Sequence, residues 1–254
     1  MSMQKSQVVN PLIALVTGAS RGIGRAIAFR LAAEGFHVII NYRKSEDDAK
    51  SLCKWIESKG YPEAWPIQAD VSNLEEVKRL FFEIKMRFGS LTVLVNNAGM
   101  TSDNLFLLTK DENWWSVLES NLKPVINCCR MALPFMISQN SGQIINITSI
   151  SGLHGSPGQT AYSASKAAIA GFSRSLAREV SRYGICINCV APGLFDTDMV
   201  KSHGEQVIQR HITRSQIKRL GKPEEVAELV TMLASGKVGF LFGQEIIIDG
   251  GLSM

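Results

Sequence analysis

The sequence lacks the features that would point to a membrane, to secretion or to nucleic acid. It has no apolar run of about 18 residues, the length that a membrane-spanning helix needs. Residues 1–10 are polar with one lysine and no apolar block, which argues against a secretory signal. Lysine plus arginine exceeds aspartate plus glutamate by only four (27 against 23), and the charges are scattered along the chain. We therefore expect a cytoplasmic protein that binds neither a membrane nor nucleic acid.

Cysteine and histidine are also scarce, and their spacing argues against disulfide and zinc sites. Five cysteines in 254 residues do not make a disulfide framework. Cys186 and Cys189 have redox-motif spacing, but they lie in an alternating run that predicts a buried strand, where side chains three apart point to opposite faces. Core packing is the preferred interpretation. No metal is expected, because the histidines show no ligand spacing: His37, His154, His203 and His211.

Short apolar runs alternate with longer stretches of helical period. The runs predict strands at 12–16, 37–42, 91–95, 143–148, 185–190 and 245–249, with a weaker seventh at 64–68. Helices are predicted at 22–34, 46–59, 74–88, 112–137, 160–182 and 223–234. This alternation predicts a doubly wound, Rossmann-type α/β fold, in which helices cover both faces of a parallel seven-stranded sheet. We interpret residues 1–254 as a single domain.

One segment, residues 197–221, interrupts this rhythm because it is polar and long. It predicts either a mobile lid over the substrate or a surface insertion of helical turns. Ligands in such folds bind beyond the carboxyl ends of the strands, so the residues after each strand are the candidates for chemistry.

A glycine-rich motif at 17–24 lies between the first strand and the first helix. Glycine allows a tight turn and close backbone approach, and a helix amino terminus attracts phosphate. The alternative is a turn with glycine for conformational reasons alone. The second strand ends in Asn41-Tyr42-Arg43 with no carboxylate, so Arg43, with Arg21, is predicted to bind the 2′-phosphate of NADPH.

Tyr162 and Lys166 are four residues apart at the start of a predicted helix, and therefore lie on one face. A neighbouring ammonium and a cationic nicotinamide would stabilise the phenolate and bring the phenol pKa, ordinarily about 10, toward a useful acid/base range. For an isolated pair of this kind, a capped helix with a solvated lysine would be the preferred interpretation. His154, in the loop 152–158, has no partner spacing for a general base, and we interpret it as a loop residue.

Further motifs occur in the order typical of the short-chain dehydrogenase/reductase family, and the chain resembles this family over nearly its whole length. The matching pieces are 17–24, Asp70-Val71, Asn96 to Gly99, Asn121, Ser149, Tyr162 with Lys166, and Pro192-Gly193. The resemblance implies that the cofactor is bound by Gly18, Ser20, Arg21, Gly22, Ile23, Gly24, Arg43, Asp70, Val71, Asn97, Ala98, Gly99, Tyr162, Lys166, Pro192, Gly193, Phe195 and Thr197. Asn96 is expected to tie neighbouring backbone.

The same resemblance implies the catalytic roles. Tyr162 would donate a proton while Ser149 hydrogen-bonds the substrate carbonyl. Lys166 would hold the cofactor ribose and lower the phenol pKa, and Asn121 would hold a water that connects Lys166 to solvent. A non-catalytic cofactor-binding subunit is the alternative, but all four of these residues are present.

Within the family the resemblance is to 3-oxoacyl-[acyl-carrier-protein] reductases, through residues 20–27, 103–105, 158–159, 172–180 and 196–199. It implies an NADPH-dependent reduction of an acyl thioester in fatty acid biosynthesis, by a homotetramer. Reduction of another ketone, such as a small carbonyl, a sugar or a polyketide intermediate, is the alternative. Residues 138–143 carry no charge where such reductases tend to be basic, although Arg174, Arg178 and Arg182 remain. An acyl-carrier protein is therefore a possible partner.

Overall fold

A seven-stranded parallel sheet forms the centre of the computed structural model, which describes residues 11–201 and 204–254. The expectations for residues 1–10 and for His203 lie outside the described residues. The strands follow the order β3-β2-β1-β4-β5-β6-β7, which confirms the predicted fold class and the weak third strand. Their bounds are β1 Ile13–Val16, β2 His37–Tyr42, β3 Trp65–Gln68, β4 Val93–Asn96, β5 Gly142–Ile147, β6 Ile185–Pro192 and β7 Glu245–Ile248.

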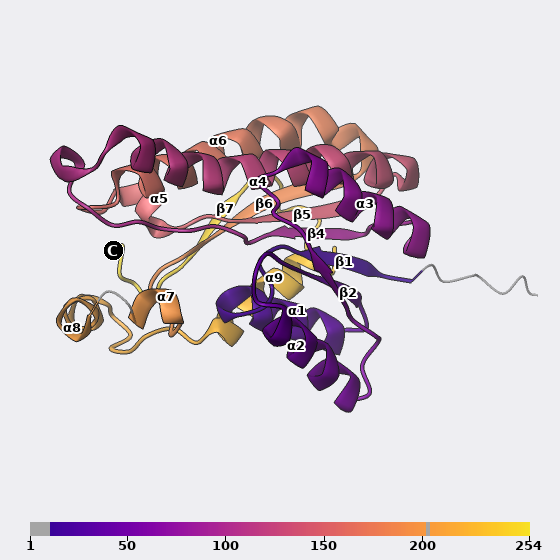
Figure 1. The fold of residues 1–254 in the computed structure, drawn as a ribbon, viewed down its shortest axis with the longest axis horizontal. Helices are drawn as coiled ribbons and strands as arrows, with labels where there is room; N and C mark the ends of the chain where they lie inside the picture. Colours follow the sequence, from indigo (N-terminus) through magenta and orange to yellow (C-terminus); the bar gives the residue numbers. More distant parts are fainter. Residues whose placement is uncertain (1–10, 202–203) are drawn as a thin grey trace, which may run out of the picture.

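Helices cover both faces of this sheet (Figure 1). On one face lie α1 (Gly22–Ala33), α2 (Glu46–Ser58) and α9 (Pro223–Ala234), and on the other lie α3 (Leu74–Phe88), α4 (Asp111–Gln139) and α6 (Thr160–Val180). Shorter pieces are α5 (Ile150–His154), α7 (Asp198–Lys201), α8 (Glu205–Arg214) and the 3₁₀ turns η1 (Phe106–Leu108) and η2 (Ser181–Tyr183).

The core is divided by the sheet into two layers, as the alternation of side chains along a strand requires. In β1, Ala14 and Val16 belong to the layer under α1, α2 and α9, whereas Ile13 and Leu15 belong to the layer under α3, α4 and α6. All four of these residues are fully buried. Because both faces of the strand are covered, it reads in the sequence as a continuous apolar run.

The strand order reverses beside β1, since β2 and β3 lie on one side of it and β4 to β7 on the other. The loops after β1 and β4 therefore diverge and leave a crevice at the carboxyl edge of the sheet. Both loops carry sequence motifs singled out above.

The segment 197–221 forms two short helices, α7 and α8, and closes on itself at its base. Phe195 and Gly221 form a parallel bridge, in which Asp196 N donates to Gly221 O at 2.8 Å and Gly221 N donates to Leu194 O at 3.0 Å. The segment thus contains the helical turns of the second alternative. Its motion stays a prediction.

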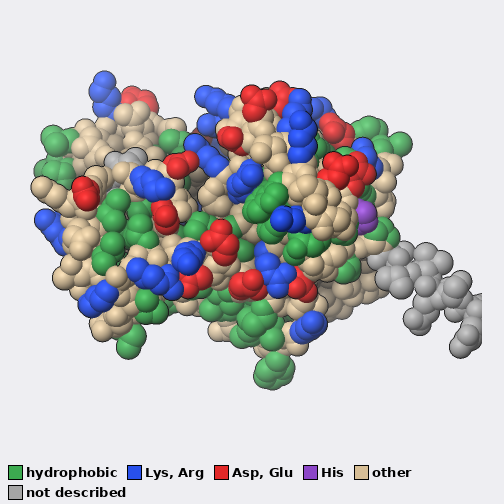
Figure 2. Space-filling view, turned by 90° about the horizontal axis from the view of Figure 1, so that it is seen from below, with side chains coloured by type: hydrophobic (Ala, Val, Ile, Leu, Met, Phe, Trp, Pro, Cys, Tyr) green, Lys and Arg blue, Asp and Glu red, His purple; other side chains and the backbone are tan. Residues whose placement is uncertain are grey.

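The surface carries mixed charges where it can be seen in Figure 2, which looks onto the molecule from the α1, α2 and α9 side. Acidic and basic side chains are interspersed over that face. None of the helices in the described ranges is both long and apolar enough to cross a membrane.

Candidate active site

A cleft of about 550 Å³ opens at the carboxyl edge of the sheet, beside the strand-order reversal. Its volume is in the usual range of cofactor sites, about 300–1,000 Å³. It brings together most of the predicted cofactor residues: Gly18, Ser20, Arg21, Gly22, Ile23, Gly24, Arg43, Asp70, Val71, Asn97, Ala98, Gly99 and Thr197. The other predicted cofactor residues lie outside its lining: Tyr162, Lys166, Pro192, Gly193 and Phe195. Pro192 is the last residue of β6, and Phe195 is buried against Gly221.

The glycine loop leaves no room for side chains at its centre. Gly18 and Gly22 have φ values of 61° and 55°, a region that glycine adopts without strain. A Cβ on Gly24 would lie 2.5 Å from Asn97 Nδ2 and 2.5 Å from Gly18 O. The loop backbone is therefore bare toward the cleft at the amino terminus of α1, which is the arrangement that suits a phosphate.

Two asparagine amides fix this loop. Asn97 Nδ2 donates to Thr17 O at 3.0 Å and to Gly18 O at 3.1 Å. The buried Asn41 accepts from Gly18 N at 3.3 Å and donates to Ala69 O at 3.0 Å. Asn41 thus links the ends of β1 and β3, and sequence reasoning missed this role.

Asn96 was expected to be structural, with its amide tied to neighbouring backbone; its contacts are structural, but they are made to side chains. Asn96 Nδ2 donates to Asn146 Oδ1 at 2.8 Å and to Cys129 Sγ at 3.4 Å, all of them buried side chains. Because alternate residues of a strand face opposite sides, the strand end turns Asn96 into the core and Asn97 toward the glycine loop.

Cationic side chains gather where β2 ends. Arg21, Arg43 and Lys44 all line the cleft, and Arg43 Nη1 lies 3.5 Å from Asp70 Oδ2. Burial alone would raise the pKa of Asp70, but hydrogen bonds from the Ser72 hydroxyl and N–H and the Arg43 charge together lower it. Lys44 was not predicted, although its place directly after Arg43 was a usable signal.

The proposed catalytic side chains lie at the start of α5, on α6 and on α4. Ser149 follows β5 and caps α5, accepting from Ser151 N at 3.2 Å. Lys166 is 4% exposed and donates to Ile147 O at 2.8 Å. A Cβ on Gly99 would lie 3.6 Å from Lys166 Nζ, so this amine borders the end of the cleft.

Burial dominates the proton affinities of these groups. It raises the pKa of Tyr162 to about 12, with a further increase from the Asp103 charge and a partial decrease from a hydrogen bond with Ser149. Burial also lowers the pKa of Lys166 to about 8. The lowering of the phenol pKa, expected from Lys166 together with a cationic nicotinamide, stays a prediction. The ammonium bonds to Ile147 O, and it lies 5.5 Å from the centre of the phenol ring.

Asn121 is fully buried in α4 and ties three elements together. Its Oδ1 accepts from Met100 N at 2.8 Å, and its Nδ2 donates to Met100 O at 3.0 Å and to Ser165 Oγ at 3.1 Å. Asn121 therefore fixes the loop after β4 to the helix that carries Tyr162. Its proposed part in a water relay stays a prediction.

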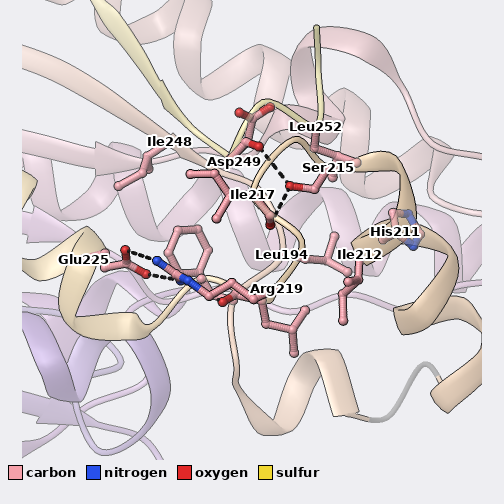
Figure 3. A pocket seen from close by; sticks show the side chains of 14 residues that line it. Leu194, His211, Ile212, Ser215, Ile217, Arg219, Glu225, Ile248, Asp249 and Leu252 are labelled. Atoms are coloured by element: carbon pink, nitrogen blue, oxygen red, sulfur yellow. Dashed lines mark hydrogen bonds and ion pairs between the residues drawn. The ribbon is translucent and has the colours of Figure 1, made fainter.

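A second, smaller cavity of about 100 Å³ lies at the base of the segment 197–221 (Figure 3). At one end Arg219 and Glu225 form a bidentate ion pair, with both N–O distances 2.8 Å. Ser215 Oγ donates to Gly250 O at 2.9 Å, which ties this segment to the turn after β7. The cavity is therefore framed by contacts that hold the segment in place.

Within residues 11–201 and 204–254, no group of three or more histidine, cysteine, aspartate or glutamate side chains is arranged to hold a metal ion. His154 ends α5 and is exposed.

Comparison with known proteins agrees with the family that the sequence motifs resemble. A family model described as short chain dehydrogenase matches residues 12–208. The 3-oxoacyl-[acyl-carrier-protein] reductase of Staphylococcus aureus is 44% identical over 241 residues, which cover 95% of this chain and 98% of that protein. The reductases of the same name from a Synechocystis species and from Thermotoga maritima are 42% identical over 243 residues and 39% identical over 241 residues. These two alignments cover 95% and 94% of this chain, and 97% of each relative.

Proposed function

Because the chain belongs to the short-chain dehydrogenase/reductase family, we propose that it reduces a 3-oxoacyl thioester to the 3-hydroxyacyl thioester with NADPH. The observation that carries this proposal is that Tyr162 lies beside Ser149 and Lys166, while Lys166 approaches Gly99 in the lining of a cleft that suits a dinucleotide. The substrate class rests on the similarity to 3-oxoacyl-[acyl-carrier-protein] reductases.

The cleft fits a nicotinamide dinucleotide phosphate by its own chemistry. The bare glycine loop at the start of α1 would hold the pyrophosphate. Asp70 and Val71 would hold the adenine, and Arg43, Arg21 and Lys44 would bind the 2′-phosphate. When bound, the cofactor supplies the hydride that reduces the ketone carbon. A preference for NADH in steady-state assays would contradict the assignment of Arg43.

The proton for the ketone oxygen comes from Tyr162 in this proposal. A phenol whose pKa is raised to about 12 is almost wholly protonated at neutral pH, so it rests in the form that an acid needs. Ser149 donates a second hydrogen bond to the same oxygen as negative charge develops there.

Lys166 completes the proton path. With its pKa lowered to about 8, the amine keeps its proton at pH 7 yet releases it more readily than a solvated lysine. It would return a proton to Tyr162 after each turnover. Asn121 would hold the water that connects Lys166 to solvent.

Three further parts of the proposal concern the carrier of the substrate, the assembly of the chain and the segment 197–221. The thioester is carried by acyl-carrier protein or by coenzyme A, and the uncharged residues 138–143 favour slower association with an acidic carrier. The chain assembles as a cytoplasmic homotetramer, with the segment 197–221 as its substrate lid. Size-exclusion chromatography with light scattering would contradict the tetramer by showing a monomer.

The test of the function follows NADPH absorbance with acetoacetyl thioesters of both carriers, beside NADH and a set of unrelated ketones. Rapid, NADPH-specific oxidation with a thioester supports the proposal. Turnover of a different ketone alone would keep Tyr162 as the acid and remove the substrate assignment. No turnover with any ketone would favour a non-catalytic cofactor-binding subunit.

A further inference from the structure

The loop after β4 is tied to the amino terminus of α6 by a pair of polar side chains. Gln159 Nε2 donates to Asp103 Oδ2 at 2.7 Å, although the two residues are 56 positions apart. Thr101 Oγ1 also donates to Asp103. The Asp103 carboxylate thus accepts two side-chain hydrogen bonds, one from its own loop and one from Gln159, the N-cap residue of α6.

The other end of Gln159 reaches toward the proposed catalytic hydroxyl. Its Oε1 accepts from Ser151 Oγ at 3.0 Å, and Ser151 N donates to Ser149 Oγ at 3.2 Å. The amide orientation follows from the partners, because a carboxylate only accepts and the Ser151 hydroxyl needs an acceptor. Hydrogen bonds therefore link Asp103 to Gln159 and Gln159 to the Ser151 side chain, and the backbone of the same Ser151 binds Ser149.

The contact between Gln159 and Asp103 also lies beside the first turn of α6, which contains Tyr162. The backbone of Gln159 accepts from Ser163 N at 2.8 Å, within the first turn of α6. A second backbone bond, from Asn104 N to Gly158 O at 2.9 Å, runs beside the Asp103–Gln159 pair. The first turn of α6 contains no acidic residue of its own, so Asp103 provides the negative charge that favours a helix amino terminus.

We propose that Asp103 and Gln159 are positioning residues that hold Ser149 and Tyr162 in register for the transfer of the proton to the ketone. The inference rests on the proposed function, and it adds two residues that make no contact with the reacting atoms. Asp103 and Gln159 lie on separate loops and are hydrogen-bonded to each other. Both loops border proposed catalytic groups.

The experiment exchanges the carboxylate of Asp103 and the amide of Gln159 between the two positions. D103N removes the charge, and Q159E places two carboxylates against each other. The double variant D103N/Q159E restores one amide and one carboxylate, and it keeps acceptors for Thr101 and Ser151. E83Q serves as the control, since Glu83 forms an exposed ion pair with Arg79 at 3.5 Å on α3.

We expect each single variant to lower kcat with a 3-oxoacyl thioester by about tenfold, as loss of one charge-assisted bond implies. The dissociation constant of NADPH should stay unchanged. The double variant should recover to within about threefold of the parent, whereas E83Q should match it. Single variants within twofold of the parent, or a double variant no better than Q159E, would overturn the proposal.

Hydrogen exchange on the same proteins separates this inference from the proposed function. Residues 100–108 and 150–163 should exchange faster in the single variants and return to the parent rate in the double variant. If the parent reduces no 3-oxoacyl thioester, the proposed function fails, and the exchange rates alone decide the inference. Unchanged exchange in D103N and Q159E would then overturn it.

Discussion

Replacement of Lys166 by methionine should change how the stability of the protein depends on pH. Lys166 is only 4% exposed, so solvent screens it little. Its pKa falls from 10.5 to about 8 on folding, which corresponds to roughly 3 kcal/mol at about 1.36 kcal/mol per unit. This amount is the free-energy cost of keeping the ammonium buried at neutral pH.

The sign follows from proton counting. Below pH 8 both the folded and the unfolded chain keep this proton, and the full cost is present. Between pH 8 and the unfolded pKa the unfolded chain binds more protons than the folded one, so stability rises with pH. The free energy of unfolding of the parent, relative to Lys166→Met, should therefore increase by about 1 kcal/mol between pH 7 and pH 9.

Urea unfolding at pH 7, 8 and 9 measures this difference through the fluorescence of the 4 tryptophans. Protein concentration is held fixed, since assembly would shift apparent stability. Groups that titrate in both proteins and do not interact with Lys166 cancel in the comparison. A difference that stays flat across this range would refute the reasoning, because it would mean that Lys166 keeps an ordinary pKa.

Three other predictions concern the cleft and the acid. Tyr162→Phe should lower kcat by about 10²–10⁴ through loss of the acid and leave NADPH affinity unchanged in fluorescence titration; near-normal turnover would remove Tyr162 from the mechanism. Arg43→Ala should raise the KM for NADPH by about tenfold but not that for NADH, and equal effects on both would disprove the phosphate contact. Gly24→Ala should weaken cofactor binding in calorimetry and destabilise the fold by about 1–3 kcal/mol, because its Cβ would lie 2.5 Å from Asn97 Nδ2; unaltered affinity would show that the loop can shift.

The sheet was predictable because its strands are buried on both faces. Each of the seven runs became a strand, and even the weak run 64–68 became β3. Helix ends were harder to predict. The helix expected at 112–137 contains Pro124 and Pro134 and yet runs to Gln139. It ends where Asn140 adopts the left-handed conformation with φ 51°. The short helix α5 was interpreted in part as a loop, since five residues give too little periodicity to recognise.

Motifs identified the residues around the cleft, but not the contacts between them. Asn41 and Asn97 hold the glycine loop across 23 and 80 positions of sequence, and Gln159 reaches Asp103 across 56. Such pairs depend on strand order and on the direction of each strand end, which periodicity does not specify. The pKa of Tyr162 depends on such contacts too, because burial, the Ser149 hydrogen bond and the Asp103 charge together set it in the cofactor-free protein.

Because Phe195 and Gly221 form a bridge, the stretch between them can be replaced as a unit. Its two ends are pinned together beside β6, so a change of length or sequence inside it need not disturb the register of the sheet. Closing a flexible loop costs only about 0.6 kcal/mol for each doubling of its length. Chimeras that exchange the part between Thr197 and Ser215 with a relative should therefore fold, because the bridge, the cleft-lining Thr197 and the Ser215–Gly250 bond are all kept.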